Sequence, residues 1–210
     1  MPKIGDEKKQ KRIDHILYHA LDLFAEKGYS ETSIDEIANH AGISKGGIYT
    51  YFKSKESIFI AIAEIGIGKR QAIVTAVKKK SSFRQKLEMY IESTLLDYTR
   101  DENFKRVKLS IEFWVKNYNR SHIGEVTKQE YIDGRFKVSS DDLVQILEGG
   151  IESGEFDKDI DIDAVAYTIL TGIDGMTYAA AMLNKPITHK RIETFKTMVL
   201  VSIISGRKTV

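Results

Sequence analysis

Several residue types that would indicate particular classes of protein are absent or scarce in this chain. It contains no cysteine, which excludes a disulfide framework, a thiol nucleophile and a thiolate metal site. Its only prolines are Pro2 and Pro186, so the interior is free to form long helices. No uncharged run approaches the roughly 18 residues of a membrane span, and the charged N-terminus lacks the apolar core of a signal peptide. We therefore expect a cytoplasmic protein with no membrane association.

A strong excess of charge of one sign is also missing. The formal net charge is +2 over 210 residues, of which 42% are hydrophobic and 30% charged, a composition typical of a folded globular protein. The placement of charges is more informative than their sum. Lys8, Lys9, Lys11 and Arg12 form a basic cluster, which is either a solvated end or an arm that touches DNA.

A segment near the N-terminus carries the signals of three short helices in close succession. Ser33 and Glu36 have the spacing of a capping box for the first helix. Ser44 is placed to cap the second, and Ser54 the third. Gly42 supplies a sharp turn between the first two, because glycine enters left-handed geometry without steric cost. This pattern predicts a helix-turn-helix, whose second helix lies in the major groove of DNA.

The second of these helices, residues 45–51, is expected to expose groups suited to DNA. Hydroxyls, an ammonium group and two glycines where the backbone can approach closely are groups that meet phosphates and base edges. The candidates are Ser44, Lys45, Gly46, Gly47, Tyr49, Thr50 and Tyr51. Lys55, at the N-terminus of the next helix, is expected to contact a phosphate. The alternative is a small helical subdomain with no nucleic-acid role.

This segment resembles the DNA-binding domain of TetR-family transcriptional regulators. The resemblance rests on ordered motifs, Thr32, Ile37-Ala38, Gly42-Ile43-Ser44-Lys45-Gly46, Tyr49-Thr50-Tyr51-Phe52 and Ser54-Lys55-Glu56. It adds Thr32 to the DNA-binding candidates. Gly47 departs from the pattern, since many relatives carry a side chain there. Two adjacent glycines also weaken a short helix by roughly 1 kcal/mol each relative to alanine.

Beyond this segment, apolar residues recur at helical spacing with no alternating strand pattern. The predicted helices cover residues 8–27, 55–79, 83–100, 103–119, 161–183 and 188–205, and residues 122–153 form a less regular region. We predict an all-α fold with two domains. Residues 1–54 form a three-helix helix-turn-helix DNA-binding domain, and residues 55–210 form a larger helical regulatory domain for ligand binding and dimerisation.

The two C-terminal helices carry apolar stripes that are candidates for a dimer interface. Two such helices from each of two subunits make a four-helix contact, and two-fold symmetry doubles the contact with DNA. The interface candidates are Ile169, Gly172, Ile173, Met176, Phe195, Val199 and Ile203. The alternative is that the stripes face the core of their own domain. The resemblance also implies a homodimer.

The resemblance further implies a small-molecule sensor in roughly residues 80–180, where large adaptable apolar side chains gather. Such side chains line ligand pockets, although at helical spacing they are more often plain core. The ligand candidates are Trp114, Tyr118, Met89, Tyr131 and Met176. A ligand would favour a pose of the 55–79 helix in which the two recognition helices of a dimer no longer fit successive major grooves.

Enzymatic motifs fail on inspection. His15 and His19 have the spacing of a metal pair, but Ile16 stands where a zinc protease needs glutamate. The alternating Asp157, Asp159 and Asp161 lack the glycine and final glutamate of a calcium loop. We expect no enzymatic activity, no cofactor and no metal.

The sequence as a whole therefore predicts a homodimeric transcriptional regulator, most simply a repressor that an unidentified small-molecule effector releases from a palindromic operator in double-stranded DNA. The alternative is a DNA-anchored interaction protein that recruits a protein partner.

Overall fold

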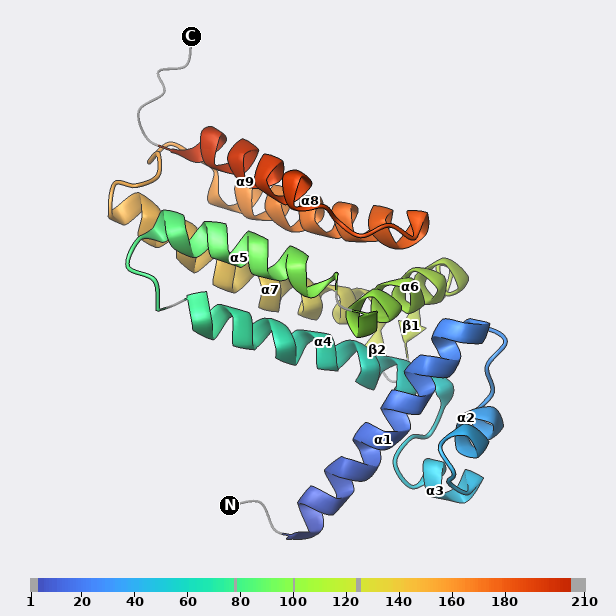
Figure 1. Ribbon diagram of the computed structural model, residues 1–210. Helices are drawn as coiled ribbons and strands as arrows, with labels where there is room; N and C mark the ends of the chain where they lie inside the picture. Colours follow the sequence, from blue (N-terminus) through green and yellow to red (C-terminus); the bar gives the residue numbers. More distant parts are fainter. Residues whose placement is uncertain (1–3, 78, 100, 124–125, 205–210) are drawn as a thin grey trace. The chain divides into compact units, whose positions relative to one another are not determined.

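The computed structural model describes residues 4–77, 79–99, 101–123 and 126–204 (Figure 1). Over these residues the elements, in chain order, are α1 (Ile4–Lys27), α2 (Ile34–His40), α3 (Lys45–Tyr49), α4 (Lys55–Val77), α5 (Phe83–Asp97), α6 (Asp101–Lys116), β1 (His122–Ile123), β2 (Val126–Thr127), α7 (Lys128–Glu152), α8 (Ile162–Leu183) and α9 (His189–Ile203). No helix in these ranges is both long and apolar enough to cross a membrane.

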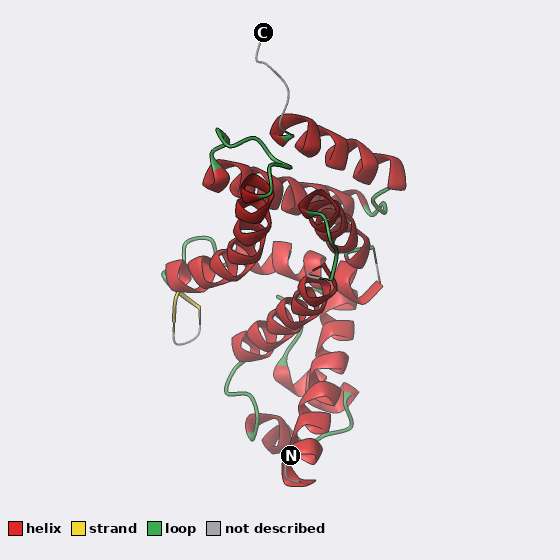
Figure 2. Ribbon diagram, turned by 90° about the vertical axis from the view of Figure 1, so that its left-hand side faces the viewer, coloured by secondary structure: helices red, strands yellow, loops and turns green. Residues whose placement is uncertain are grey.

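The predicted all-α fold is confirmed, with one small addition. Figure 2 shows helices throughout the described chain and a single short hairpin, in which β1 and β2 pair antiparallel with Ile123 opposite Val126. The region expected to be irregular, residues 122–153, instead contains this hairpin and the long helix α7.

Two adjacent glycines near the end of α7 explain part of that difference. A Cβ atom on Gly149 would lie 2.1 Å from the ring of Phe83, and one on Gly150 would lie 2.0 Å from the ring of Phe156. The glycines are therefore places where aromatic rings pack directly on the helix backbone. In the sequence they look like helix breakers, because the rings that need the space are remote or lie beyond the helix.

The chain forms two compact units. Unit 1 comprises Met1–Gly66 and Phe104–Lys128, and unit 2 comprises Ile67–Asn103 and Gln129–Val210. This division does not coincide with the boundary expected after residue 54, and the outer limits of the expected domains, residues 1–3 and 205–210, lie outside the described residues.

Aromatic packing explains why unit 1 includes part of α4 and all but the start of α6. The ring of Phe59 on α4 stacks on that of Phe113 on α6, with centroids 3.6 Å apart and planes 9° apart. Tyr29, which follows α1, meets both rings edge-on. Phe59 and Phe113 are at most 1% exposed, so helices distant in sequence share one apolar core with α1, α2 and α3.

Unit 2 is held by an apolar core and by polar links between its helices. Its buried side chains include Leu87, Tyr90, Leu147, Ile173 and Ile192. Glu155 reaches back to the start of α5, where its carboxylate accepts hydrogen bonds from the backbone N–H groups of Phe83 and Arg84, both at 3.0 Å. The turn before α8 thereby supplies partners for the free N–H groups at the start of α5.

Candidate nucleic-acid interface

The start of the helix-turn-helix is closed by the predicted capping box. The backbone N–H of Ser33 donates to Glu36 Oε2 at 2.8 Å, and the backbone N–H of Glu36 donates to Ser33 Oγ at 3.2 Å. The carboxylate of Glu36 also accepts a hydrogen bond from Lys27 at 2.8 Å. The hydrogen bonds that the carboxylate accepts, from Lys27 foremost and then from the backbone N–H and the hydroxyl of Ser33, lower the pKa of Glu36 to about 2.

The turn between α2 and α3 is also as predicted. Gly42 has a φ of +63°, in the left-handed region that glycine occupies at the end of a helix. The backbone N–H of Ile43 returns to the carbonyl of Ala38 at 2.9 Å. Ser44 then caps α3 by accepting a hydrogen bond from the backbone N–H of Gly47 at 3.1 Å. Two successive helix ends are thus satisfied within a few residues, which holds α3 at a defined angle to α2.

One side of α3 is buried and the other is exposed. Ile48 is fully buried and anchors the helix in the core of unit 1. The exposed set, here called the recognition face, consists of Ser44, Lys45, Gly46, Tyr49 and Thr50. Tyr49 is 46% exposed, an unusual position for a large aromatic side chain. Hydroxyls, a cation and an open stretch of backbone therefore lie together on one short helix.

Lys45 is held on this face by an ion pair. Its Nζ lies 2.8 Å from Asp35 Oδ1 on α2, and both side chains are more than half exposed. This partner raises the pKa of Lys45, first through the hydrogen bond and then through its charge. Exposed pairs of this kind contribute little to stability, so a phosphate can compete for the ammonium group at low cost.

The two glycines of α3 have different surroundings. A Cβ on Gly46 would meet nothing within 4 Å, whereas one on Gly47 would lie 2.7 Å from Cγ2 of Ile43. Gly47 is therefore required by packing inside the motif. Gly46 leaves the backbone open to the outside, as expected for a site of close approach to DNA.

Thr32 and Tyr51 do not lie where a DNA contact was expected. Thr32 is 1% exposed, and its hydroxyl donates to the carbonyl of Gly28 at 2.7 Å. The structure thus corrects its role: Thr32 closes the end of α1 from the inside. Tyr51 is half-buried and packs against the core of unit 1.

Lys55 is also turned inward, contrary to its expected contact with a phosphate. Its Nζ donates to the carbonyls of Tyr29 at 2.6 Å, Ser30 at 3.2 Å and Thr32 at 2.7 Å. An ammonium group has three N–H donors, so all of them are engaged within the chain. Burial, followed by the charge of Lys116, lowers the pKa of Lys55. We correct its assignment from phosphate contact to internal support.

Residues of α6 that the sequence did not single out hold the same connection between α1 and α2. The carboxylate of Glu112 accepts hydrogen bonds from the backbone N–H groups of Tyr29 at 2.7 Å and Ser30 at 3.0 Å. Lys116 Nζ donates to Ser30 Oγ at 2.6 Å. Over eighty residues separate these partners, and no local motif marks such a contact. Only the fold reveals that α6 positions the start of the helix-turn-helix.

The ligand candidates fall into both units. Trp114 and Tyr118 belong to unit 1, and Met89, Tyr131 and Met176 belong to unit 2. Trp114 packs edge-on against Phe113, while Tyr118 is 74% exposed beneath the ammonium group of Lys128. Tyr118 is thus a surface residue, and the same ammonium group also lies 6.0 Å from the centre of the Trp114 ring.

The dimer candidates prove to be on the inner sides of α8 and α9. Ile169, Ile173, Val199 and Ile203 are at most 7% exposed. A Cβ on Gly172 would lie 2.6 Å from the ring of Phe195, so these two residues contact each other within one chain. Met176 is half-buried. The predicted stripes therefore face the chain's own core, which was the alternative interpretation.

A second apolar stripe occupies the outer sides of the same helices, here called the outer face. Its members are Tyr167, Tyr178, Met182 and Leu183 on α8 and Met198 and Val201 on α9, all at least 40% exposed. The spacing of Tyr167, Tyr178 and Met182 follows a helical period, so the sequence did contain this signal. The periodicity of α8 did not single out this stripe, because that helix is apolar on both sides.

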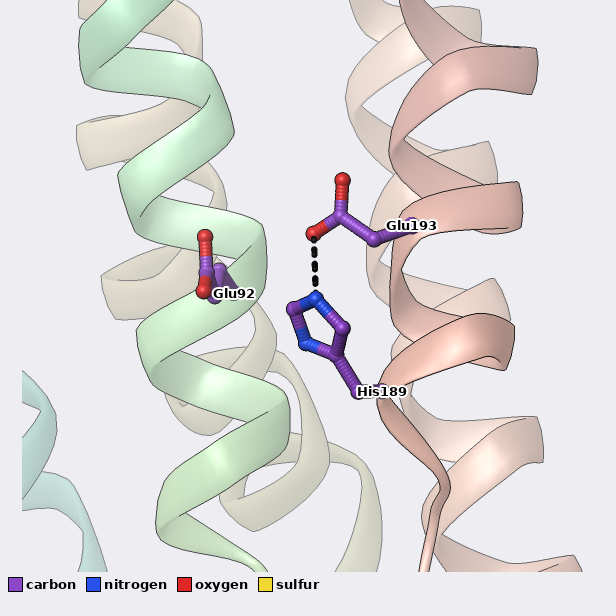
Figure 3. Close-up of side chains that lie close together, drawn as sticks. All are labelled: Glu92, His189 and Glu193. Carbon is purple, nitrogen blue, oxygen red and sulfur yellow. Dashed lines mark ion pairs between the residues drawn. The ribbon is translucent and has the colours of Figure 1, made fainter.

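One cluster in unit 2 has the residue types of a metal site. Ligand atoms of Glu92, His189 and Glu193 lie within 4.8 Å of one another (Figure 3). However, Lys196 Nζ is 2.8 Å from Glu92 and 2.9 Å from Glu193. The ammonium group already lies where a cation would bind both carboxylates, so the cluster is an ion network that fastens α9 to α5.

Comparisons with known proteins agree with this geometry. Residues 16–62 match the family described as bacterial regulatory proteins, tetR family, and residues 86–191 match the tetracyclin repressor-like C-terminal domain. The fatty acid metabolism regulator protein of Bacillus subtilis (strain 168) is 30% identical over 172 residues, which cover 79% of this chain and 82% of that protein.

Solved structures share the whole fold. The fatty acid degradation regulator FadR from Bacillus halodurans has a TM-score of 0.75 at 20% identity, covering 90% of this chain and 94% of that one. FadR from Bacillus subtilis, in complex with stearoyl-CoA, has a TM-score of 0.63 at 24% identity, covering 92% and 98%. With a capped helix-turn-helix and matches over both parts of its length, this chain belongs to the TetR family of DNA-binding transcriptional regulators.

Proposed function

We propose that this protein is a homodimeric repressor that binds a palindromic operator through the recognition face and leaves it when a small molecule binds in unit 2. The observation that carries the proposal is the exposed set of hydroxyl, ammonium and glycine positions on α3, within a family of DNA-binding regulators. Such a protein acts on the chromosome, in the bacterial cytoplasm.

The outer face supports the homodimer. Six large apolar side chains on two adjacent helices are exposed, and exposed groups of apolar side chains mark interaction sites. Pairing of two copies along α8 and α9 would bury these side chains in a four-helix contact. A two-fold dimer presents two recognition faces, which matches an inverted repeat in DNA.

We propose an effector with a long apolar chain, of the acyl-CoA class. The support comes from relatives: one is named a fatty acid metabolism regulator, and one solved structure holds stearoyl-CoA. In unit 2, Met89, Tyr131 and Met176 are the candidate apolar contacts. Thr94 on α5 adds a polar one, since its hydroxyl is buried and finds no hydrogen-bond partner among the described residues.

The proposed release is a shift between two poses of α4. This helix belongs to both units, because its residues up to Gly66 lie in unit 1 and those from Ile67 lie in unit 2. A ligand that favours one pose changes the spacing of the two recognition faces. DNA affinity then falls only as far as the ligand distinguishes the two poses.

Selection of bound fragments from random genomic DNA tests the proposal. An inverted repeat should be recovered, and stearoyl-CoA should release it, whereas free CoA should not. Tyr49→Ala should lose the selected sequence, while Tyr118→Ala, an exposed tyrosine on the segment after α6, should retain it. Recovery of no preferred sequence, or equal binding by both variants, would contradict the proposed interface.

A further inference from the structure

Three histidines from two helices meet on the surface of unit 1. His15 and His19 lie on α1, and His40 lies in the last turn of α2. The ring centroids of His15 and His19 are 4.5 Å apart, and those of His19 and His40 are 4.9 Å apart. His15 Nε2 donates to the carbonyl of Ala41 at 2.8 Å. The three rings therefore connect α1 to the end of α2, directly before the turn into α3.

The hydrogen bond between His19 and His40 forms only when at most one of the two rings is protonated to its charged state. Their Nδ1 atoms are 3.0 Å apart, which is a hydrogen bond only if one nitrogen carries a proton and the other offers a lone pair. When both rings are protonated, both Nδ1 atoms are donors. The hydrogen bond is then lost, and two positive charges face each other at short range.

The groups around His19 oppose its charging. The pKa of His19 is lowered by burial first, and then by the neighbouring charges of His15 and His40. Asp22, on the next turn of α1, acts in the opposite direction. Its carboxylate is itself paired with Lys105 of α6 at 2.9 Å, and the remaining neighbour, the ring of Tyr18, meets His19 edge-on. Asp22, the acidic group that acts on His19 in the described part of the chain, is thus partly neutralised.

We propose that the His19–His40 contact is a proton-sensitive link within the DNA-binding unit. It ties α1 to α2 while no more than one of the two rings is charged. Acid that charges both rings opens the link, loosens the position of α2 and α3, and weakens DNA binding.

The direction of the pH dependence follows from the lowered pKa of His19. The unfolded chain protonates this ring at its ordinary pKa of 6.5, and the folded chain does so only at lower pH. Just below pH 6.5, the unfolded state therefore binds more protons, and stability rises with pH. The full contribution is present above pH 6.5 and is lost as the pH falls toward the pKa of the folded state.

Histidine titration by NMR tests the link in the full-length protein without DNA. In the parent protein, with EDTA present to exclude metal ions, the titration midpoint of His19 should lie below the ordinary histidine pKa of 6.5. In the His40→Gln variant, the midpoint of His19 should move upward toward 6.5, because one of the charges that lower its pKa is gone. His122→Gln should leave it unchanged. An unchanged midpoint in His40→Gln would overturn the proposal.

DNA binding supplies a second readout, which rests on the proposed function. The probe is the inverted-repeat duplex recovered by selection, measured at constant ionic strength between pH 7.5 and 5.5. The parent should lose several-fold more affinity over this range than His40→Gln does. If instead the histidines simply face phosphates, acid should strengthen binding in the parent more than in the variant, and the proposal fails. The NMR result stands even if no operator is found, so the two failures are distinguishable.

Discussion

At the scale of single residues, two lysines near the recognition face show how surroundings decide a role. Lys45 keeps its side chain in solvent, with one exposed carboxylate partner, while Lys55 gives three hydrogen bonds to carbonyls of the segment between α1 and α2. The sequence places both beside a helix N-terminus. Only the fold separates the residue that can reach DNA from the one that supports the motif.

We therefore expect opposite effects from removing these two side chains. Lys45→Ala should reduce the slope of log affinity against log salt by about 0.9, the value for one lost phosphate contact, with little change in stability. Lys55→Ala should leave the slope unchanged and lower the free energy of unfolding by about 2 kcal/mol, because buried carbonyls lose a charged donor. Salt titrations and thermal unfolding of both variants measure this. A reduced salt slope in Lys55→Ala would show instead that Lys55 contacts a phosphate.

Residues whose signal is local were the ones that the sequence could predict. The caps at Ser33 and Ser44 and the left-handed Gly42 depend on neighbours within a few positions, and they are confirmed. Thr32 was assigned to DNA only from its place in a motif, and its buried hydroxyl shows a different role. No local sequence pattern predicts the role of Glu112, because its hydrogen-bond partners are more than eighty residues away.

At the scale of elements, the two glycines of α3 serve different purposes. Gly46 leaves the backbone open to DNA, and Gly47 makes room for Ile43. Gly46→Ala places a methyl group in open space and should stabilise the protein by about 0.5–1 kcal/mol, because alanine favours helix and loses less entropy on folding. It should nevertheless weaken operator binding, since DNA approaches the backbone there. Gly47→Ala should destabilise by about 1–3 kcal/mol through the clash with Ile43.

Thermal unfolding and operator titration of both variants separate these effects. A stabilised Gly46→Ala protein with unchanged DNA affinity would show that the backbone of α3 makes no close approach. A stabilised Gly47→Ala protein would show that the side chain of Ile43 can move aside without lowering the free energy of unfolding.

The first turn of α5 depends on a carboxylate from the turn between α7 and α8. Hydrogen bonds from the Ser82 hydroxyl and from the N–H groups of Arg84 and Phe83 lower the pKa of Glu155 to about 2. The unfolded value is 4.5, so this stabilisation is complete above pH 4.5 and is lost as the pH falls toward 2. Glu155→Gln should cost about 1 kcal/mol at neutral pH, a value kept small because solvent screens the carboxylate.

Chemical unfolding of Glu155→Gln at a series of pH values checks this expectation. The difference from the parent should shrink below pH 4.5. Glu152→Gln, an exposed glutamate three residues earlier, is the matched control and should show no such trend. A pH-independent difference would mean that the hydrogen bonds do not require the charge.

At the scale of the whole molecule, the outer face defines where a second copy would bind. Met182 and Met198 are 76% and 66% exposed, so a charged residue at either site should leave the fold intact. Burial of such a side chain contributes about 1.5–3 kcal/mol. Met182→Glu and Met198→Glu should therefore each raise the Kd of the dimer about tenfold or more and weaken operator binding in parallel.

Light scattering after size-exclusion chromatography, over a range of concentrations, measures the dimer. Val115→Glu on α6, which is 74% exposed in unit 1, carries the same change in charge and should remain dimeric. A dimer that persists in both methionine variants would move the interface away from α8 and α9.

The same helices show why whole-molecule features resist prediction. Periodicity identified α8 and α9 and their apolar stripes, and the all-α fold followed from such patterns along the chain. It could not decide which of two apolar sides of α8 faces the core, because Ile173 and Tyr178 look equally suited to burial. That choice depends on the packing of α5 against both helices, which no single segment encodes.

The split composition of unit 1 has a consequence for its biosynthesis. Its apolar core includes Leu109, Phe113 and Ile123 as well as buried side chains between Ile16 and Ile62. A ribosome delivers the chain from the N-terminus, so the helix-turn-helix emerges well before the side chains that complete its core. The core of unit 1 can therefore be completed only after part of unit 2 has been synthesised. A nascent chain that stalls before residue 123 carries a helix-turn-helix whose apolar core is incomplete.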